Sequence, residues 1–77
     1  MAGKELIEYI AKSIVDDPSQ VRVDEFEDLN SVVFELHVAP EDKGRVIGKE
    51  GRVANAMRTL LRVWATKEGK HAVLKIV

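Results

Sequence analysis

Apolar positions near the start of the chain repeat every three to four residues. This spacing predicts an amphipathic helix over residues 4–15, with charged side chains on its other side. The apolar positions of this helix are Leu6, Ile7, Ile10, Ala11 and Ile14. Because Pro18 disfavours helical geometry in the residue before it, the helix is expected to stop at the segment Asp16-Asp17.

The period then changes to two, which is typical of β-strands. Residues 21–27 and 32–38 are predicted strands, and the second shows the clearer alternation of apolar and other side chains. Its apolar positions on one face are Val32, Phe34, Leu36 and Val38. The turn-forming segment 28–31 lies between the two strands, so a hairpin is expected.

Helical spacing returns after Pro40, a residue that suits the first position of a helix. A short helix is predicted to break at Gly48, and a longer one runs from Gly51 to about Lys67. The apolar stripe expected on the longer helix is Val53, Met57, Leu60 and Trp64, widened by Ala56 and Leu61. The polar stripe opposite it is Arg52, Asn55, Thr59, Arg62 and Thr66.

The chain ends in a third predicted strand. Gly69 fits a helix C-cap, and residues 71–76 alternate between the two faces of a sheet. The full order is helix, strand, strand, helix, helix, strand. The apolar stripes of three helices need a common surface to cover, which predicts an α+β, two-layer fold with all helices on one face of a three-stranded sheet.

Length and composition narrow the class of protein. Seventy-seven residues predict one domain, residues 1–77. The absence of cysteine excludes a disulfide framework, a thiolate zinc site and a cysteine nucleophile. No apolar run approaches the length of a membrane span, and the first residues lack the apolar centre of a signal peptide. We therefore expect a cytoplasmic protein that does not partner a membrane.

Charge divides the chain into two unlike halves. Residues 1–42 carry three basic and eleven acidic residues, a formal charge of −8, whereas residues 43–77 carry nine basic and two acidic residues, a formal charge of +7. A polyanion responds to the local field rather than to the net charge, so the second half is a candidate nucleic-acid surface. Charge alone leaves open the alternative that the halves fold together and balance.

The segment between the two later helices carries the most specific chemistry. Gly48 and Gly51 bracket a two-residue turn, and glycine allows a positive φ and a close approach of another backbone. The helix that follows presents unpaired N–H groups and the positive end of its dipole, which together suit a phosphate. Cationic side chains surround this point: Arg45, Lys49 and Arg52. Val46 and Ile47 are expected to anchor the short helix to the core.

This segment resembles the signature loop of KH domains. The resemblance rests on Val46-Ile47-Gly48-Lys49-Glu50-Gly51-Arg52, followed by apolar spacing at Val53, Met57, Leu60 and Leu61. The order of elements resembles the type II, bacterial arrangement, and the match covers nearly the whole chain. At this length the chain is similar to the KhpA family of small, stand-alone bacterial KH-domain RNA-binding proteins.

The resemblance implies a groove for about four unpaired nucleotides, clamped along their backbone by the loop. One wall would be the loop and the start of the long helix, and the other the edge of the second strand. The expected RNA-binding residues are Arg45, Ile47, Gly48, Lys49, Glu50, Gly51, Arg52 and Asn55. Glu50 places a carboxylate inside this loop, where it is expected to point to solvent.

The resemblance also implies partners and a role. Beside single-stranded RNA, these are a second copy of the chain and a larger protein that carries its own KH domain. The role would be that of an RNA chaperone or a post-transcriptional regulator. The alternative is a protein–protein adaptor that keeps the KH shape but depends little on RNA.

A surface for self-association is expected on the second half of the long helix. On a helical wheel, Val63 falls inside the polar arc, while Leu61 and Ala65 lie at the margin of the apolar stripe. A symmetric dimer would place the same patch of each copy against the other. The alternative is that Leu61 and Ala65 complete the core and that the protein is a monomer.

Other chemistry is weakly represented. The run from Gly44 to Lys49 fails as a nucleotide-binding P-loop, because the glycine spacing is one residue short and Glu50 replaces the required Ser or Thr. His37 and His71, as neighbours in the sheet, would still lack a third metal ligand. The acidic run over residues 24–28 is expected to be a solvated hairpin surface. We therefore expect no enzymatic activity, no metal and no cofactor.

Overall fold

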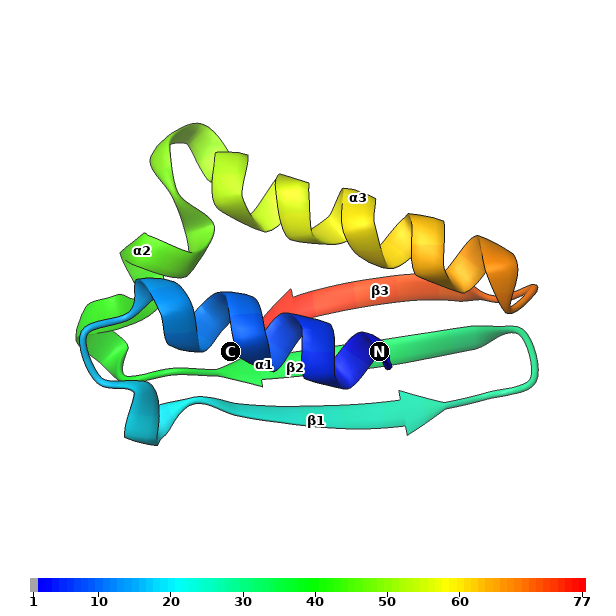
Figure 1. The fold of residues 1–77 in the computed structure, drawn as a ribbon, viewed down its shortest axis with the longest axis horizontal. Coiled ribbons are helices and arrows are strands. Elements are labelled where there is room, and N and C mark those ends of the chain that lie inside the picture. Colours follow the sequence, from blue (N-terminus) through cyan, green and yellow to red (C-terminus); the bar gives the residue numbers. More distant parts are fainter. Residues whose placement is uncertain (1) are drawn as a thin grey trace.

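The computed structural model describes residues 2–77, which form three α-helices and three strands (Figure 1). In chain order these are α1 (Gly3–Ile14), β1 (Arg22–Glu27), β2 (Ser31–His37), α2 (Lys43–Ile47), α3 (Arg52–Lys67) and β3 (His71–Ile76). Short 3-10 turns precede β1, α2 and α3, at Pro18–Gln20, Pro40–Asp42 and Lys49–Gly51. The predicted order of elements and the α+β class are confirmed.

The strands form one mixed sheet in the order β1-β2-β3. β1 and β2 are antiparallel, as the predicted hairpin requires, with Val23 opposite Leu36. β3 runs parallel to β2 and places Leu74 beside Phe34. The central strand is therefore β2, whose two edges are both hydrogen-bonded, while β1 and β3 form the edges of the sheet.

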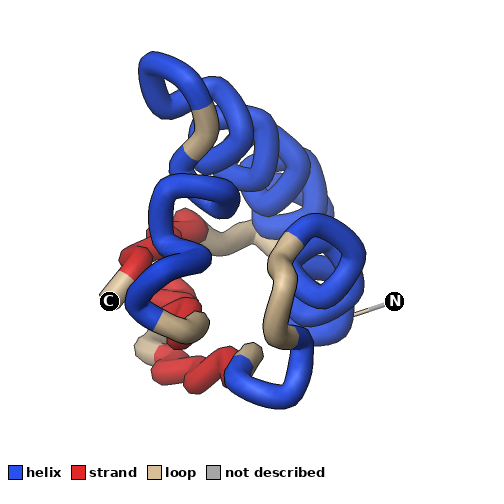
Figure 2. Tube along the Cα trace, turned by 90° about the vertical axis from the view of Figure 1, so that its left-hand side faces the viewer, coloured by secondary structure: helices blue, strands red, loops and turns tan. Residues whose placement is uncertain are grey.

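Helices and strands occupy separate layers (Figure 2). The period of two along β2 turns its apolar side chains toward the helices, and Val32, Phe34 and Leu36 are fully buried there. Helices α1 and α3 cover this face: the core combines the β2 residues with Ile7, Ala11, Val23, Val46, Met57, Leu61 and Leu74. Phe34 meets Trp64 of α3 edge to face, with ring centroids 5.8 Å apart.

The apolar stripe of α3 is rotated relative to the prediction. Leu60 is 46% exposed and Ala56 is exposed, whereas Leu61 is buried. The buried residues of this helix are Ala54, Met57, Leu61 and Ala65. Because each residue advances an α-helix by about 100°, the adjacent leucines compete for one position in the core, and the register with Met57 and Ala65 favours Leu61.

The end of α1 is tied to α2 by a fully buried carboxylate. Asp42 accepts hydrogen bonds from the backbone N–H groups of Asp16 and Asp17, both at 3.1 Å. The sequence did not predict this contact across the fold. The bonds fix α2, and with it the loop that follows. In the part of the chain described, no helix is long and apolar enough to cross a membrane.

Candidate nucleic-acid interface

The Gly48–Gly51 loop reverses the chain between α2 and α3. Gly48 adopts φ +78° and ψ 173°, and a Cβ atom there would lie 2.5 Å from Cγ2 of Val53 and 2.8 Å from its backbone nitrogen. Glu50 and Gly51 follow with φ values of 57° and 75°. Only glycine fits position 48, because both the positive φ and the contact with the Val53 backbone exclude a side chain.

The loop presents its polar groups to solvent. Lys49 and Glu50 are exposed at the tip, and Arg52 is exposed at the first turn of α3. Glu50 Oε2 lies 3.9 Å from Arg52 Nη2, so the loop's carboxylate is beside one of its cations. No side chain among residues 2–77 caps the N-terminus of α3. The N–H of Arg52 bonds to the backbone oxygen of Lys49, so this sixteen-residue helix offers a phosphate the N–H groups that follow Arg52.

The two apolar residues before the loop have different environments. Val46 is fully buried and anchors α2 to the core, as predicted. Ile47 is 41% exposed, so the expectation that it also anchors the helix is wrong. A five-residue helix has only one buried side, and Val46 occupies it. Ile47 instead offers apolar surface next to Gly48.

Arg45 is engaged within the protein. Its Nη2 atom lies 3.1 Å from Oδ2 of Asp16, and its Nε atom lies 3.7 Å from Oδ1 of the buried Asp42. These ion pairs draw the guanidinium toward the end of α1. Its contact with RNA stays a prediction, and a phosphate there would have to displace the exposed Asp16 carboxylate.

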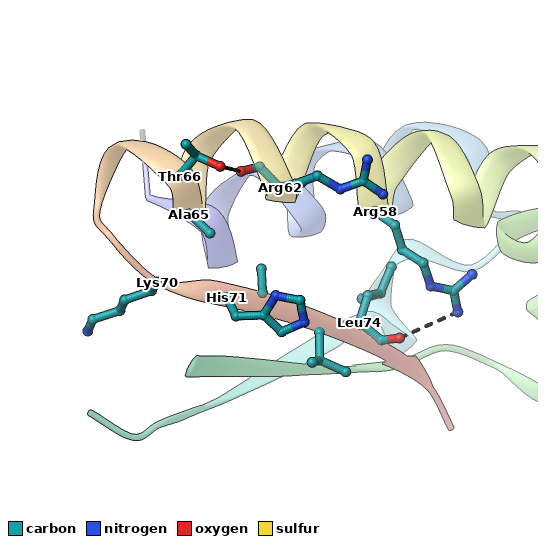
Figure 3. A pocket seen from close by; sticks show the side chains of 9 residues that line it. Arg58, Arg62, Ala65, Thr66, Lys70, His71 and Leu74 are labelled. Atoms are coloured by element: carbon teal, nitrogen blue, oxygen red, sulfur yellow. Dashed lines mark hydrogen bonds between the residues drawn. The ribbon is translucent and has the colours of Figure 1, made fainter. Parts of the chain in front are cut away.

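The second wall of the predicted groove lies elsewhere than expected. Because β2 is central and paired on both sides, the prediction that its edge lines the groove is wrong. The edge strand that packs beside α3 is β3, which pairs only with β2 in the described chain. Arg58 spans the gap: its Nη2 atom donates to the backbone oxygen of Leu74 at 3.4 Å, and its Nη1 atom donates to Asn55 Oδ1 at 3.2 Å. Figure 3 shows this bridge from α3 to β3.

A pocket of about 340 Å³ opens between α3 and β3. It is lined by Arg58, Arg62, Ala65, Thr66, Lys70, His71, Ala72, Val73 and Leu74 (Figure 3). The sequence placed Arg62 and Thr66 on the polar stripe of α3 but did not pair that stripe with β3. One sequence signal could have suggested that the two elements form one surface: neither residues 52–67 nor residues 71–76 contain an acidic side chain.

The exposed apolar residues on the second half of α3 differ from those expected for the self-association surface. Leu61 and Ala65 are each 1% exposed, so the expectation that they line an outer patch is wrong. Val63 is 56% exposed, as its place in the polar arc predicted. The same rotation that buries Leu61 exposes Leu60, and these two exposed apolar residues, Leu60 and Val63, lie one turn apart.

The two histidines are not neighbours. His37 lies opposite Arg22, and His71 lies beside Ser31 at the other end of β2. His37 instead joins Asp24 and Glu35 on the sheet face away from the helices, with their ligand atoms within 4.8 Å of one another. Arg22 Nη2 stands 3.2 Å from both Asp24 Oδ2 and His37 Nε2. Because this guanidinium already balances the cluster, we assign no metal to it.

Comparisons with known proteins give a consistent answer. A family profile described as "KhpA/KhpB, KH domain" matches residues 4–76. The chain is 51% identical to a Clostridium acetobutylicum protein named "RNA-binding protein KhpA" over 74 residues, covering 96% of this chain and 99% of the relative. It is 47% identical to an Aquifex aeolicus protein of the same name over 76 residues, covering 99% of this chain and 96% of the relative. No solved structure matched the chain.

Proposed function

The chain belongs to the KhpA/KhpB family of KH domains, a family of RNA-binding proteins rather than enzymes, and we propose that it binds single-stranded RNA in a groove between the Gly48–Gly51 loop and β3. The observation that carries this proposal is the loop itself. Three of its four residues have positive φ, and its tip exposes Lys49 beside the uncapped start of α3. That arrangement suits the backbone of about four nucleotides.

The free edge of β3 supports the second wall. Backbone N–H and C=O groups on an unpaired edge can hydrogen-bond to the edges of bases that are splayed out of a stack. The cations on this side are not balanced by acids on the same elements: α3 carries Arg52, Arg58, Arg62 and Lys67, and neither α3 nor β3 contains an acidic residue. The groove therefore combines backbone groups that meet bases with side chains that attract phosphates. The role we propose for it is that of an RNA chaperone or post-transcriptional regulator.

A titration with matched single-stranded and duplex RNA tests the proposal. We expect weak binding to the single strand and little to the duplex, since stacked and paired bases cannot turn toward β3. Affinity should fall as salt rises, with a slope of about −0.7 for each phosphate contacted. Equal affinity for the two forms, or binding that ignores salt, would contradict the groove.

The exposed pair Leu60 and Val63 favours a second, compatible function as a docking surface. The two side chains are 46% and 56% exposed and belong to the outer side of α3. We propose that they contact a second copy of the chain or a larger KH-domain protein. Sedimentation across a wide concentration range tests self-association. A monomer mass throughout contradicts the dimer, and dissociation of a dimer by Val63→Asp supports this assignment.

A further inference from the structure

Strand β1 is an edge of the sheet whose outer side is unpaired. Among residues 2–77 it pairs only with β2, and it lies on the far side of β2 from β3 (Figure 1). At the hairpin end, the N–H of Asp28 donates to the backbone oxygen of Ser31. Antiparallel partners alternate between pairs with and without hydrogen bonds, so the backbone groups of Val23, Glu25 and Glu27 point away from β2. No turn or loop of the described chain hydrogen-bonds to them.

This edge lacks most of the features that prevent another strand from adding to it. Residues 22–27 contain no proline, glycine or lysine, and their register with β2 runs from Arg22 to Glu27 without a bulge. What the edge does carry is acidic charge. Glu25 is exposed and has no ion-pair partner in the part of the chain described, whereas Glu27 pairs with Lys70 at 2.7 Å. The edge is therefore open to a strand that its charge accepts.

The charge of the edge selects a basic partner. Residues 21–28 carry one basic and four acidic residues, a formal charge of −3. Two copies of β1 would bring the glutamates of both strands together, and like charges opposite one another destabilise a strand pair, whereas opposite charges stabilise it. The same charge repels RNA. Complementarity thus favours an extended, basic peptide over a second copy of this chain and over a nucleic acid.

The pleat of β1 sets the pattern of side chains that such a peptide needs. The side chain of Val23 is buried in the core, so Glu25 and Glu27, two and four residues later, belong to the face of the sheet that the helices cover. Phe26 belongs to the other face, where it is 55% exposed and stands opposite Val33 of β2. A strand paired with β1 therefore meets a carboxylate on one face and an aromatic ring on the other.

We propose that β1 binds an extended, basic peptide of another protein, which adds to the sheet as a fourth, antiparallel strand. Its residues alternate between lysine or arginine, which pair with Glu25, and apolar residues, which pack on Phe26. The outward backbone groups of β1 supply the main-chain hydrogen bonds. This site and the proposed RNA groove lie on opposite edges of the sheet, so the protein holds both ligands at once. The inference goes beyond the proposed function and does not depend on it.

Three synthetic peptides of seven residues test the proposal on the wild-type protein. The first alternates lysine with valine, and the second alternates glutamate with valine. The third is the first with its lysine backbone nitrogens methylated, which keeps the charge and removes the N–H groups that would face β1, because residues opposite Glu25 share its hydrogen-bonded side. We expect the first peptide to bind at least about tenfold more tightly than either of the others.

Amide hydrogen exchange, followed by nuclear magnetic resonance, locates the bound peptide. The first peptide should slow exchange at the outward amides of Val23, Glu25 and Glu27. It should leave the amides of Asp24 and Phe26 unchanged, because the alternation of the ladder already bonds them to β2. Protection at every second residue is the result expected of strand addition and not of a basic peptide attracted by charge alone.

Glu25→Lys tests the edge from the side of the protein. Glu41→Lys is the matched control, because it makes the same change of charge at an exposed position outside the sheet. We expect Glu25→Lys to weaken the lysine–valine peptide about three- to tenfold and to strengthen the glutamate–valine peptide. Glu41→Lys should change either affinity by less than about twofold. Circular dichroism checks that both variants are folded.

Several results would overturn the proposal. These are no binding of the lysine–valine peptide, equal binding of its methylated form, or equal effects of Glu25→Lys and Glu41→Lys. Protection of Val23, Glu25 and Glu27 that rises with protein concentration in the absence of peptide would assign the edge to a second copy instead. The same protection produced by single-stranded RNA would assign the edge to RNA. None of these results decides whether the Gly48–Gly51 loop binds RNA.

Discussion

The two edges of the sheet share one architecture and differ in charge. β1 carries Asp24, Glu25 and Glu27, and α1 beside it mixes acidic and basic residues. β3 carries no acidic residue, and neither does α3 beside it. Figure 1 shows the two strands on opposite sides of β2. The net charge of −1 therefore conceals one edge that repels a polyanion and one that attracts it.

The contrast also explains how the two halves of the chain stay together. Lys70 of the basic half pairs with Glu27 at the hairpin end, at 2.7 Å. Arg45 pairs with Asp16 at the other end, at 3.1 Å. Opposite charges thus meet where the halves join, while Lys49 in the loop and Arg58 and Arg62 on α3 have no ion-pair partner among residues 2–77. The charge asymmetry of the sequence therefore has two consequences: ion pairs between the two halves, and an exposed cationic surface on the basic half.

The largest effect is expected at Asp42, the last residue of the acidic half, which ties the end of α1 to the start of α2. Asp42→Ala removes a buried acceptor and leaves two backbone N–H groups, of Asp16 and Asp17, without their partner. The free energy of unfolding should fall by about 2–4 kcal/mol, measured by urea denaturation. Glu25→Ala, at an exposed position, is the control and should change it by less than about 0.5 kcal/mol. Equal effects would show that the Asp42 contact does not hold α2.

Reversing the charge at the loop should remove RNA binding. Lys49→Asp combined with Glu50→Asp places two carboxylates at the phosphate site, and affinity should fall at least about tenfold, to below detection for a weak ligand. Melting should change little, because both side chains are exposed and Asp tolerates the positive φ of position 50. Lys12→Asp on α1 is the control for net charge. Normal RNA binding by the double variant would reject the loop as the phosphate clamp.

Exchanging charge between the sheet edges tests the comparison itself. Arg62→Glu, on α3 where it lines the cleft with β3, should weaken single-stranded RNA about three- to fivefold, because it makes the attractive edge repulsive. Glu25→Lys on β1 should change affinity less than about twofold, since this edge lies outside the groove. Fluorescence anisotropy at low salt measures both. A larger effect at Glu25 than at Arg62 would show that RNA binds at the β1 edge and would contradict this account.

The smallest effect is expected at the carboxylate within the loop. Glu50→Gln removes the charge that lies 3.9 Å from Arg52 and leaves the size of the side chain unchanged. RNA affinity should rise about twofold, in keeping with the low strength of exposed ion pairs. The same titration measures it. A fall in affinity would show that Glu50 takes part in binding rather than competing for Arg52.

Local signals predicted most of the fold. Pro18, Pro40 and Gly48 break the chain where the structure does, and the alternation along β2 matches its buried face. These signals succeed because a backbone restriction or a repeat acts within a few residues of its cause. Leu60 shows the limit of such reasoning. The apolar spacing of α3 allows either Leu60 or Leu61 to face the core, and packing against the sheet selects Leu61.

The candidate site was predicted in part for the same reason. The loop is a local feature, so Gly48 and Gly51 could be assigned from their spacing. The second wall of the groove depends on strand order. No short segment of sequence indicates that β3 pairs with the outer side of β2 and so leaves β2 without a free edge. The burial of Asp42 likewise depends on a contact with residues 25 and 26 positions away. Contacts between distant parts of the chain determine the strand order and the burial of Asp42, and local periodicity carries no information about such contacts.

The most direct test of the central claim is a nuclear magnetic resonance titration of the backbone amides with a short single-stranded RNA. The account predicts that the perturbed amides cluster at Gly48–Gly51, at the first turns of α3 and along β3, with β1 and α1 unaffected. Perturbations concentrated on β1 and α1, or none at RNA concentrations that saturate binding by anisotropy, would contradict it.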